Sequence, residues 1–238
     1  MIIEFIFKGK YVVIVGGGTE GYRKALSFLD AGSRVLVASR TFSSGIKNLH
    51  QMKKIDLLKT DIKDGGAFIS QLSPKPNLLV AATNDRNLNF QLAKHAKAAG
   101  CMVYVVDNPL ISDFIFPALA KIGEVRIAIS TDGKSPLMAR VLRKRIERII
   151  SKEDLLQIKL QNYARAILKQ RILDQKVRKK VLYKILRDDD IKKFLKEGRF
   201  DEAQGIATKI LERFRENKES YKGPALTDQS LREASKSP

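Results

Sequence analysis

The sequence predicts an α/β protein in which a parallel sheet covered by helices is followed by a smaller helical region. Two observations support this prediction. A glycine-rich turn joins a short run of β-forming residues to a helical pattern within residues 11–31, and strand-like runs then alternate with helical patterns to about residue 150. Beyond that position the strand signal ends, and residues 151–214 are charged and helix-periodic, with breaks near residues 187–190 and at Gly198.

The alternation of strands and helices favours a parallel sheet with helices on both faces. Gly32 and Gly100 each follow a predicted helix, at the position where glycine commonly ends one. The predicted strands cover residues 11–15, 34–38, 55–59, 78–81, 102–106 and 125–129, and the predicted helices cover residues 19–31, 65–72, 86–99 and 137–150.

The turn after the first strand reads GGGTEG, and Gly16, Gly18 and Gly21 fit the pattern G-x-G-x-x-G. In a dinucleotide-binding Rossmann domain, the first glycine permits a tight turn and the second lets the backbone approach a pyrophosphate. The third lets the helix pack on the strand, and the phosphates lie at the helix N-terminus. The position of the motif between strand and helix predicts a dinucleotide site. The alternative is a turn in an α/β fold that binds no nucleotide.

The end of the second strand leaves the choice between NAD and NADP open. NAD-binding Rossmann domains usually place an acidic residue there, which holds the ribose 2′-OH. This chain instead has Ser39, Arg40 and Thr41. Arg40 can meet the 2′-phosphate of NADP, or it can be a solvated side chain at the mouth of a loop.

Two further strand ends carry candidate site residues, because ligands of open α/β sheets bind at the carboxyl ends of the strands. Small and polar residues, including Thr83, follow the fourth strand. Asp85 in this loop also suits the N-cap of the next helix. Asp107 follows the fifth strand and is a candidate general base, although Asp-Asn-Pro is also a common turn sequence.

The loop at residues 130–135 precedes a basic amphipathic helix. Ser135 suits its N-cap and Pro136 its first position. The loop at the start of this helix is also a candidate anion-binding site. The basic run at residues 165–180 has few aromatic residues, so a solvated helix face is expected there rather than a stacking surface for single-stranded nucleic acid.

Composition limits the class of protein and its partners. The chain has 238 residues, a formal net charge of +19 and 44% hydrophobic residues. These values suit a domain with a sizeable core and an anionic partner, which can be nucleic acid, acidic lipid or a polycarboxylate. No stretch approaches ~18 uncharged apolar residues, so no membrane span is expected. The N-terminus lacks the features of a signal peptide.

The single cysteine and the two histidines predict no internal disulfide and no metal site. A reducing, cytoplasmic location fits this composition. His50 is expected in a loop, His95 at the edge of an apolar helix face, and Cys101 in the core. The residues from Glu216 onward are polar and are expected to be disordered.

Several motifs follow one another in a characteristic order: YVVIVGGGTEGYRKA, AATND, VVDNP, FIFPALA and AISTDGKSPLMAR. In order and spacing they resemble the precorrin-2 dehydrogenases. These are the N-terminal modules of siroheme synthases, some of which also act as sirohydrochlorin ferrochelatases. The resemblance covers residues 1–150 and continues more loosely to about Phe214.

The resemblance implies oxidation of precorrin-2, an anionic tetrapyrrole, to sirohydrochlorin with NAD⁺ as hydride acceptor. It leaves open whether the chain also inserts ferrous iron. Asp107 matches the family's acid/base aspartate, and the family pattern implies a homodimer formed through the segment after residue 112. The expected cofactor-binding positions are Gly16, Gly18, Thr19, Glu20, Gly21, Arg40, Thr41 and Thr83, and the expected substrate-binding positions are Thr131, Lys134 and Ser135.

The expected organisation is a dinucleotide-binding domain (1–112), a dimerisation segment (113–150), a helical domain (151–214) and a disordered tail (215–238). The sequence departs from the family at Tyr104, where asparagine is common, and at Asp132, where a small residue is usual. No uroporphyrinogen methyltransferase module is recognised, so the chain is not expected to make precorrin-2.

Two other functions compete with the dehydrogenase. One is an NAD(P)-sensing regulator that binds nucleic acid through the basic helices, and the other is a Rossmann subunit that only regulates a partner. Asp107 and the basic helix capped by Ser135 and Pro136 argue in part against the regulator, because a regulator needs no acid at a strand end.

Overall fold

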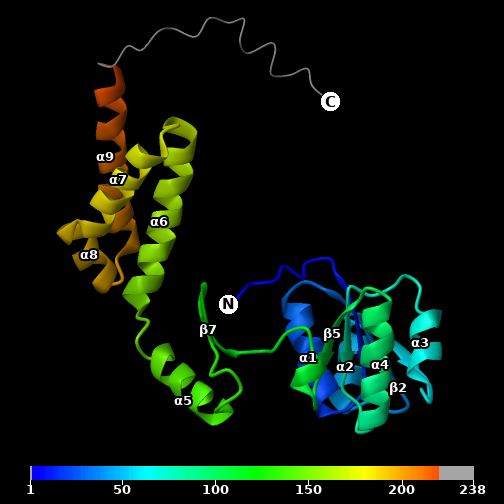
Figure 1. Ribbon diagram of the computed structural model, residues 1–238. Helices are drawn as coiled ribbons and strands as arrows, with labels where there is room; N and C mark the ends of the chain where they lie inside the picture. Colours follow the sequence, from blue (N-terminus) through cyan, green and yellow to red (C-terminus); the bar gives the residue numbers. More distant parts are fainter. Residues whose placement is uncertain (1, 220–238) are drawn as a thin grey trace, which may run out of the picture. The chain divides into compact units, whose positions relative to one another are not determined.

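The computed structural model describes residues 2–219 and divides the chain into two compact units, Met1–Phe116 and Pro117–Pro238 (Figure 1). The first unit contains the glycine turn and the strand ends at which site residues are predicted. The second unit contains the predicted helical domain and the predicted dimerisation segment from Pro117 onward, while residues 113–116 of that segment lie in the first unit.

A five-stranded parallel sheet forms the centre of the first unit, in the order β3-β2-β1-β4-β5. Its strands are β1 (Tyr11–Val15), β2 (Arg34–Ser39), β3 (Asp56–Lys59), β4 (Leu78–Ala81) and β5 (Met102–Val105). The strand order reverses between β1 and β4, which makes the carboxyl end of β1 the topological switch point, where open α/β sheets bind their ligands.

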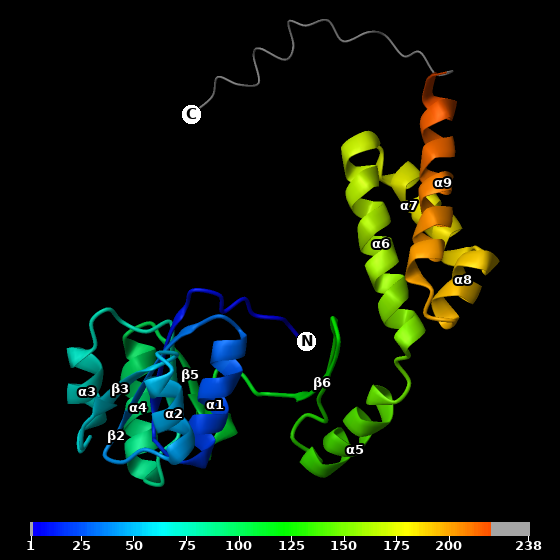
Figure 2. The same cartoon turned by 180° about the vertical axis from the view of Figure 1, so that it is seen from behind.

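Helices cover both faces of this sheet (Figures 1 and 2). One face packs against α1 (Thr19–Asp30) and α2 (Ser44–Gln51), and the other against α3 (Gly65–Gln71) and α4 (Arg86–Ala98). Successive strand residues point to opposite faces. Val12 and Ile14 therefore join the core under α1 and α2, whereas Val13 and Val15 join the core under α3 and α4.

The predicted parallel sheet is confirmed, but two predictions about elements are wrong. Val125–Ile129 is not a strand of the parallel sheet. It forms β7, which pairs antiparallel with β6 (Ala118–Ile122) in the second unit. His50 does not lie in a loop. It lies in α2, and its Nδ1 is 3.0 Å from the carbonyl oxygen of Ile55.

The second unit combines this β-hairpin with helices. They are α5 (Pro136–Glu147), α6 (Lys152–Arg171), α7 (Gln175–Arg187), α8 (Asp189–Lys196) and α9 (Phe200–Glu219). Helices α6 to α9 share one apolar core, in which Leu160, Ile185 and Ile191 are fully buried. No helix within residues 2–219 is long and apolar enough to cross a membrane.

The end of α9 corrects the predicted start of the disordered tail. Residues 215–219 continue the helix to Glu219. The remainder of the predicted tail, residues 220–238, lies outside the described residues.

A buried lysine lies among aromatic rings in the first unit. Lys24 of α1 is only 4% exposed. Its Nζ lies 4.3 Å from the ring centroid of Tyr104 and 3.5 Å from that of Phe116. Burial lowers the pKa of Lys24 to about 8. The ammonium group therefore costs the folded state desolvation energy, which the cation–π contacts offset in part.

The buried lysine predicts a pH-dependent stability difference. The folded pKa of Lys24 lies below the unfolded value, so the penalty is fully present below pH 8 and disappears as the pH rises toward 10.5. The Lys24→Met variant should therefore gain unfolding free energy relative to wild type at pH 7. This advantage should shrink by about 2 kcal/mol between about pH 7 and about pH 9.5.

The urea unfolding transition of the first unit, recorded at the two pH values, measures this difference. The control is Lys47→Met, which removes an exposed lysine from α2. Parallel pH curves for wild type and Lys24→Met would contradict the prediction.

Candidate functional site

The glycine turn is fixed by backbone contacts at its first and last glycines. Gly16 has φ +129°, and a Cβ placed there would lie 2.2 Å from the carbonyl oxygen of Ala82. A Cβ at Gly21 would lie 2.0 Å from the carbonyl oxygen of Gly16. The packing of β1, α1 and the loop after β4 therefore explains why both positions require glycine, even when no ligand is bound.

Gly18 is different, because a Cβ at this position would meet no atom within 4 Å. Gly18 is also the N-cap of α1 and supplies no side-chain cap. The first turn of α1 contains Thr19 and Glu20, and the Glu20 carboxylate pairs with Arg23 at 2.6 Å. The open space at Gly18 and the uncapped helix start suit the close approach of a phosphate.

Gly17 is a site residue that the motif did not single out. A Cβ at Gly17 would lie 2.0 Å from the carbonyl oxygen of Thr41. The Ser43 N–H also donates to the Gly17 carbonyl oxygen at 2.8 Å. These contacts bring the glycine turn against the loop after β2, where Thr41 was predicted to bind the cofactor. The middle glycine of the GGG run, which the motif leaves unspecified, was the available sequence signal.

An acidic residue does lie near the end of β2, but it comes from the loop after β3. Asp61 Oδ1 is 3.5 Å from Arg40 Nε, and both side chains are more than half exposed. The Thr60 N–H donates to the carbonyl oxygen of Ser39 at 3.1 Å, which holds the loop after β3 beside the last residue of β2. The sequence prediction looked for an acid only along β2 and so missed Asp61.

Thr83 and Asp107 lie on neighbouring strand ends, and Asn89 of α4 connects them. The Nδ2 of Asn89 donates to Asp107 Oδ1 at 3.0 Å and to the carbonyl oxygen of Thr83 at 3.0 Å. Asp85 accepts from the N–H groups of Asn87 and Leu88, which confirms its N-cap role. The structure thus joins the candidate base to the loop that touches Gly16.

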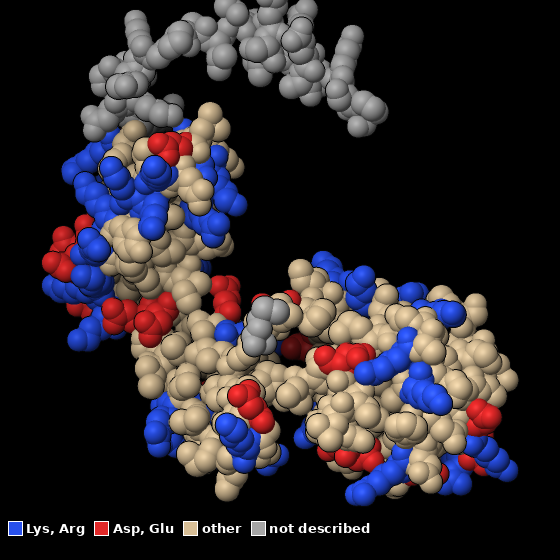
Figure 3. Space-filling view, in the orientation of Figure 1, with Lys and Arg blue, Asp and Glu red and all other residues tan. Residues whose placement is uncertain are grey.

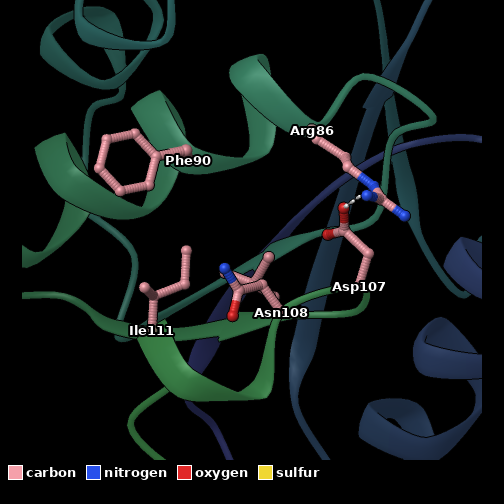
Figure 4. A pocket seen from close by; sticks show the side chains of 6 residues that line it. Arg86, Phe90, Asp107, Asn108 and Ile111 are labelled. Carbon is pink, nitrogen blue, oxygen red and sulfur yellow. Dashed lines mark ion pairs between the residues drawn. The ribbon is translucent and has the colours of Figure 1, made fainter.

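Asp107 also lines a small cavity of about 170 Å³. Figure 4 shows Arg86 and Asp107 pointing toward each other, with Arg86 Nε 3.8 Å from Asp107 Oδ2. The Arg86 side chain is 89% exposed, so water weakens this ion pair. The residues that line the cavity are Arg86, Phe90, Val105, Asp107, Asn108 and Ile111.

The predicted substrate-binding loop lies in the second unit. Ser135 is the N-cap of α5, with its Oγ accepting from the Met138 N–H at 3.2 Å, as predicted. The Ser135 N–H donates to Thr131 Oγ1 at 3.1 Å. Asp132 occupies the left-handed region with φ 50°. The Lys134 side chain is exposed.

Tyr104 does not point toward the cavity. It belongs to the core under α1 and α2, and its ring packs against Phe114 and Phe116 with centroids 5.6 and 4.8 Å apart. Burial raises the pKa of Tyr104. Within residues 2–219, no group of three or more His, Cys, Asp or Glu residues is placed to hold a metal ion.

The glycine turn at the switch point, the uncapped start of α1 and the polar strand ends define a Rossmann-type domain of the dinucleotide-binding class. Residues 3–118 match the family described as "Putative NAD(P)-binding", and residues 123–149 match the "Sirohaem biosynthesis protein central" family. The chain belongs to the precorrin-2 dehydrogenase and siroheme synthase family.

Several relatives support this membership. The precorrin-2 dehydrogenase of Methanosarcina barkeri is 31% identical over 184 residues, covering 77% of this chain and 81% of the relative. The putative precorrin-2 dehydrogenase of Methanocaldococcus jannaschii is 33% identical over 193 residues, covering 80% and 92%. The siroheme synthase of Pseudomonas aeruginosa is 34% identical over 140 residues, covering 59% of this chain. That match spans only 29% of the siroheme synthase.

A solved structure supports the fold. The structure titled "SirC, precorrin-2 dehydrogenase" matches with a TM-score of 0.70 and 21% sequence identity. The match covers 88% of this chain and 99% of the solved one.

Proposed function

We propose that the protein is an NAD-dependent precorrin-2 dehydrogenase, which oxidises precorrin-2 to sirohydrochlorin. The observation that carries the proposal is the hydrogen-bonded connection from Thr83 through Asn89 to Asp107. It fixes a carboxylate next to the strand ends at which a dinucleotide binds. Family membership supplies the substrate class.

The chemistry requires the substrate to lose two hydrogens, one as a hydride and one as a proton. NAD⁺, when bound, supplies the hydride acceptor. The turn Gly16–Gly21 and the loop containing Thr41 would hold it. Asp107 would take the proton on Oδ2, since Oδ1 already accepts from Asn89. The reaction balances as precorrin-2 and NAD⁺ giving sirohydrochlorin, NADH and a proton.

A direct assay tests the proposal. Purified protein is incubated with precorrin-2 and NAD⁺, and the absorbance of NADH and of sirohydrochlorin is followed together. Equal amounts of the two products support the proposal. A folded protein that binds NAD⁺ but forms neither product would overturn it.

We also propose that NAD⁺ is preferred over NADP⁺ because of Asp61. This carboxylate lies beside Arg40 at the strand edge where the ribose 2′-OH binds in this fold. It would accept a hydrogen bond from a 2′-OH, and it would repel a 2′-phosphate while neutralising the charge of Arg40.

Replacing Asp61 by asparagine should raise the efficiency with NADP⁺ relative to NAD⁺ at least tenfold, equivalent to about 1.4 kcal/mol. Adding Arg40→Ala to this variant should abolish most of the gain, because the exposed guanidinium would otherwise attract the 2′-phosphate. The ratio of kcat/KM values for the two cofactors is the measurement. An unchanged ratio in Asp61→Asn would remove Asp61 from cofactor selection.

Ferrous iron insertion is a second activity that family membership suggests. It requires removal of pyrrole N–H protons, and Asp107 is the carboxylate that lines the described cavity. We therefore propose that any chelation by this chain uses the same carboxylate. Thr131, Lys134 and Ser135 are proposed to contact substrate carboxylates.

We propose a homodimer formed through the segment after residue 112. Exposed apolar side chains on β6 and α5 support this assembly, because a monomer gains nothing by presenting them to water. They are Leu119, Leu137, Met138 and Val141, with exposures of 50%, 70%, 46% and 40%.

The buried free thiol of Cys101 fits the proposed cytoplasmic location.

Nucleic-acid binding is the second candidate function, and one observation favours it. Figure 3 shows Lys and Arg side chains gathered on the second unit over α6 and α7. A shallow hollow on α7 is lined by Lys176, Lys179, Lys180, Tyr183, Lys184 and Arg187. Titrating the protein with duplex DNA at two salt concentrations tests whether it binds nucleic acid. Tight, salt-sensitive binding that is lost in a Lys180→Glu, Lys184→Glu variant would support the regulator.

A further inference from the structure

We propose that Asn89 is a positioning residue that fixes the orientation of Asp107 and keeps it available as a base. This inference rests on the proposed function, since it concerns the same candidate carboxylate. The side chain of Asn89 is only 1% exposed, although asparagine is rarely buried without a specific reason.

The amide of Asn89 uses all of its hydrogen-bonding capacity. Its Oδ1 accepts from the N–H of Thr83 at 3.1 Å and from Thr83 Oγ1 at 2.7 Å. Its Nδ2 donates to the Thr83 carbonyl oxygen and to Asp107 Oδ1, each at 3.0 Å. An asparagine amide offers two donors and two acceptor lone pairs, so none is left over.

The contacts with Thr83 determine which way the amide faces. The N–H of Thr83 needs an acceptor and its carbonyl oxygen needs a donor, so a flipped amide would lose both bonds. With the amide held in this way, its remaining N–H points at Asp107. A donor at this position suits an ionised carboxylate, which is the form that a general base requires.

The two oxygens of Asp107 consequently have different surroundings. Oδ1 is occupied by Asn89, whereas Oδ2 faces the exposed Arg86 at the cavity. Two of the residues that line the cavity are charged, namely Arg86 at the start of α4 and Asp107 itself. The other lining residues are uncharged: Phe90, Val105, Asn108 and Ile111. Proton transfer is therefore directed to Oδ2.

Asn89→Asp is the sharpest test because it keeps the size of the side chain and its acceptor toward Thr83. It replaces the donor to Asp107 with a second carboxylate, and two carboxylates at hydrogen-bond distance share a proton. We expect kcat near neutral pH to fall on the order of 10- to 100-fold. The acid limb of the kcat profile should move up by at least about one pH unit, so that activity partly recovers at higher pH.

Asn87→Asp is the matched control, since it adds the same charge to an exposed position of α4. Its pH profile should match that of wild type. NAD⁺ affinity in the Asn87→Asp control should also match that of wild type. A uniform loss of kcat with an unshifted pH profile in Asn89→Asp would show a merely structural role and overturn the proposal.

A second readout does not depend on turnover. The carboxyl of Asp107, assigned by comparison with Asp107→Asn, is titrated by carbon-13 NMR in wild type and Asn89→Asp. The midpoint should be higher in Asn89→Asp than in wild type, because the new carboxylate lies at hydrogen-bond distance from Asp107. An unchanged midpoint would overturn the role of Asn89 even in an active enzyme. A wild-type protein that does not oxidise precorrin-2 would refute the proposed function separately.

Discussion

Replacing Asp107 by asparagine is expected to lower the turnover of precorrin-2 on the order of 10²- to 10⁴-fold, the usual contribution of a positioned acid or base. The fold should survive, because an asparagine Oδ1 can still accept the hydrogen bond from Asn89 Nδ2. NAD⁺ binding should also survive, since the glycine turn makes its contacts with Ala82 and Thr41 rather than with Asp107. Steady-state kinetics and an NAD⁺ titration of the same preparation measure both properties.

The matched control is Asp56→Asn, which removes an exposed carboxylate at the start of β3. It should leave kcat unchanged. If Asp107 were only a turn residue, Asp107→Asn would turn over substrate at a near-normal rate, and the assignment of the base would fail. Loss of dehydrogenation with intact iron insertion would refute only the shared use of the carboxylate.

Gly18→Asp is expected to weaken NAD⁺ binding at least about 100-fold, equivalent to about 2.8 kcal/mol. The new side chain would occupy the space that the pyrophosphate approaches and would place a negative charge against it. The variant should fold normally, because a Cβ at Gly18 meets no atom within 4 Å. Isothermal titration calorimetry measures the NAD⁺ affinity of the variant, and urea unfolding measures its stability.

Gly16→Ala provides the contrasting result. Its Cβ would lie 2.2 Å from the Ala82 carbonyl oxygen at φ +129°, so the substitution should destabilise the fold by more than about 1 kcal/mol. Gly18→Ala separates bulk from charge, and it should bind NAD⁺ more tightly than Gly18→Asp. Unchanged NAD⁺ affinity in a folded Gly18→Asp variant would rule out the glycine turn as the pyrophosphate site.

The strands β1, β4 and β5 were predictable because each is a short run of apolar residues, nearly all of them buried. The strand β6 and the helix α2 were missed because each buries only one or two of its residues and so has a weak apolar pattern. The strand β6 reads ALAKI, includes a lysine and is buried only at Ala120. The helix α2 reads SGIKNLHQ and buries only Ile46 and Leu49. Tertiary packing, rather than local pattern, decides the structure of both segments.

The candidate site was predictable where it follows strand ends and was missed where it depends on contacts between elements. Asp107 and the glycine turn lie directly after strands, so their position follows from the parallel sheet. Asn89 is separated from Asp107 by 18 positions, and its side chain reaches the site only because α4 packs beside β5. Asp61 likewise meets Arg40 because β3 pairs with β2. Neither contact has a local sequence signature.

The separation of the apolar cores bears on how the chain denatures. The two cores of the sheet draw only on residues of the first unit, and the core of helices α6 to α9 draws only on the second. Heat or urea is therefore expected to melt the chain in two cooperative steps, so that a single midpoint is not a defined quantity. A calorimetric scan would resolve two endotherms, of which Gly16→Ala would shift only the one belonging to the dinucleotide-binding unit.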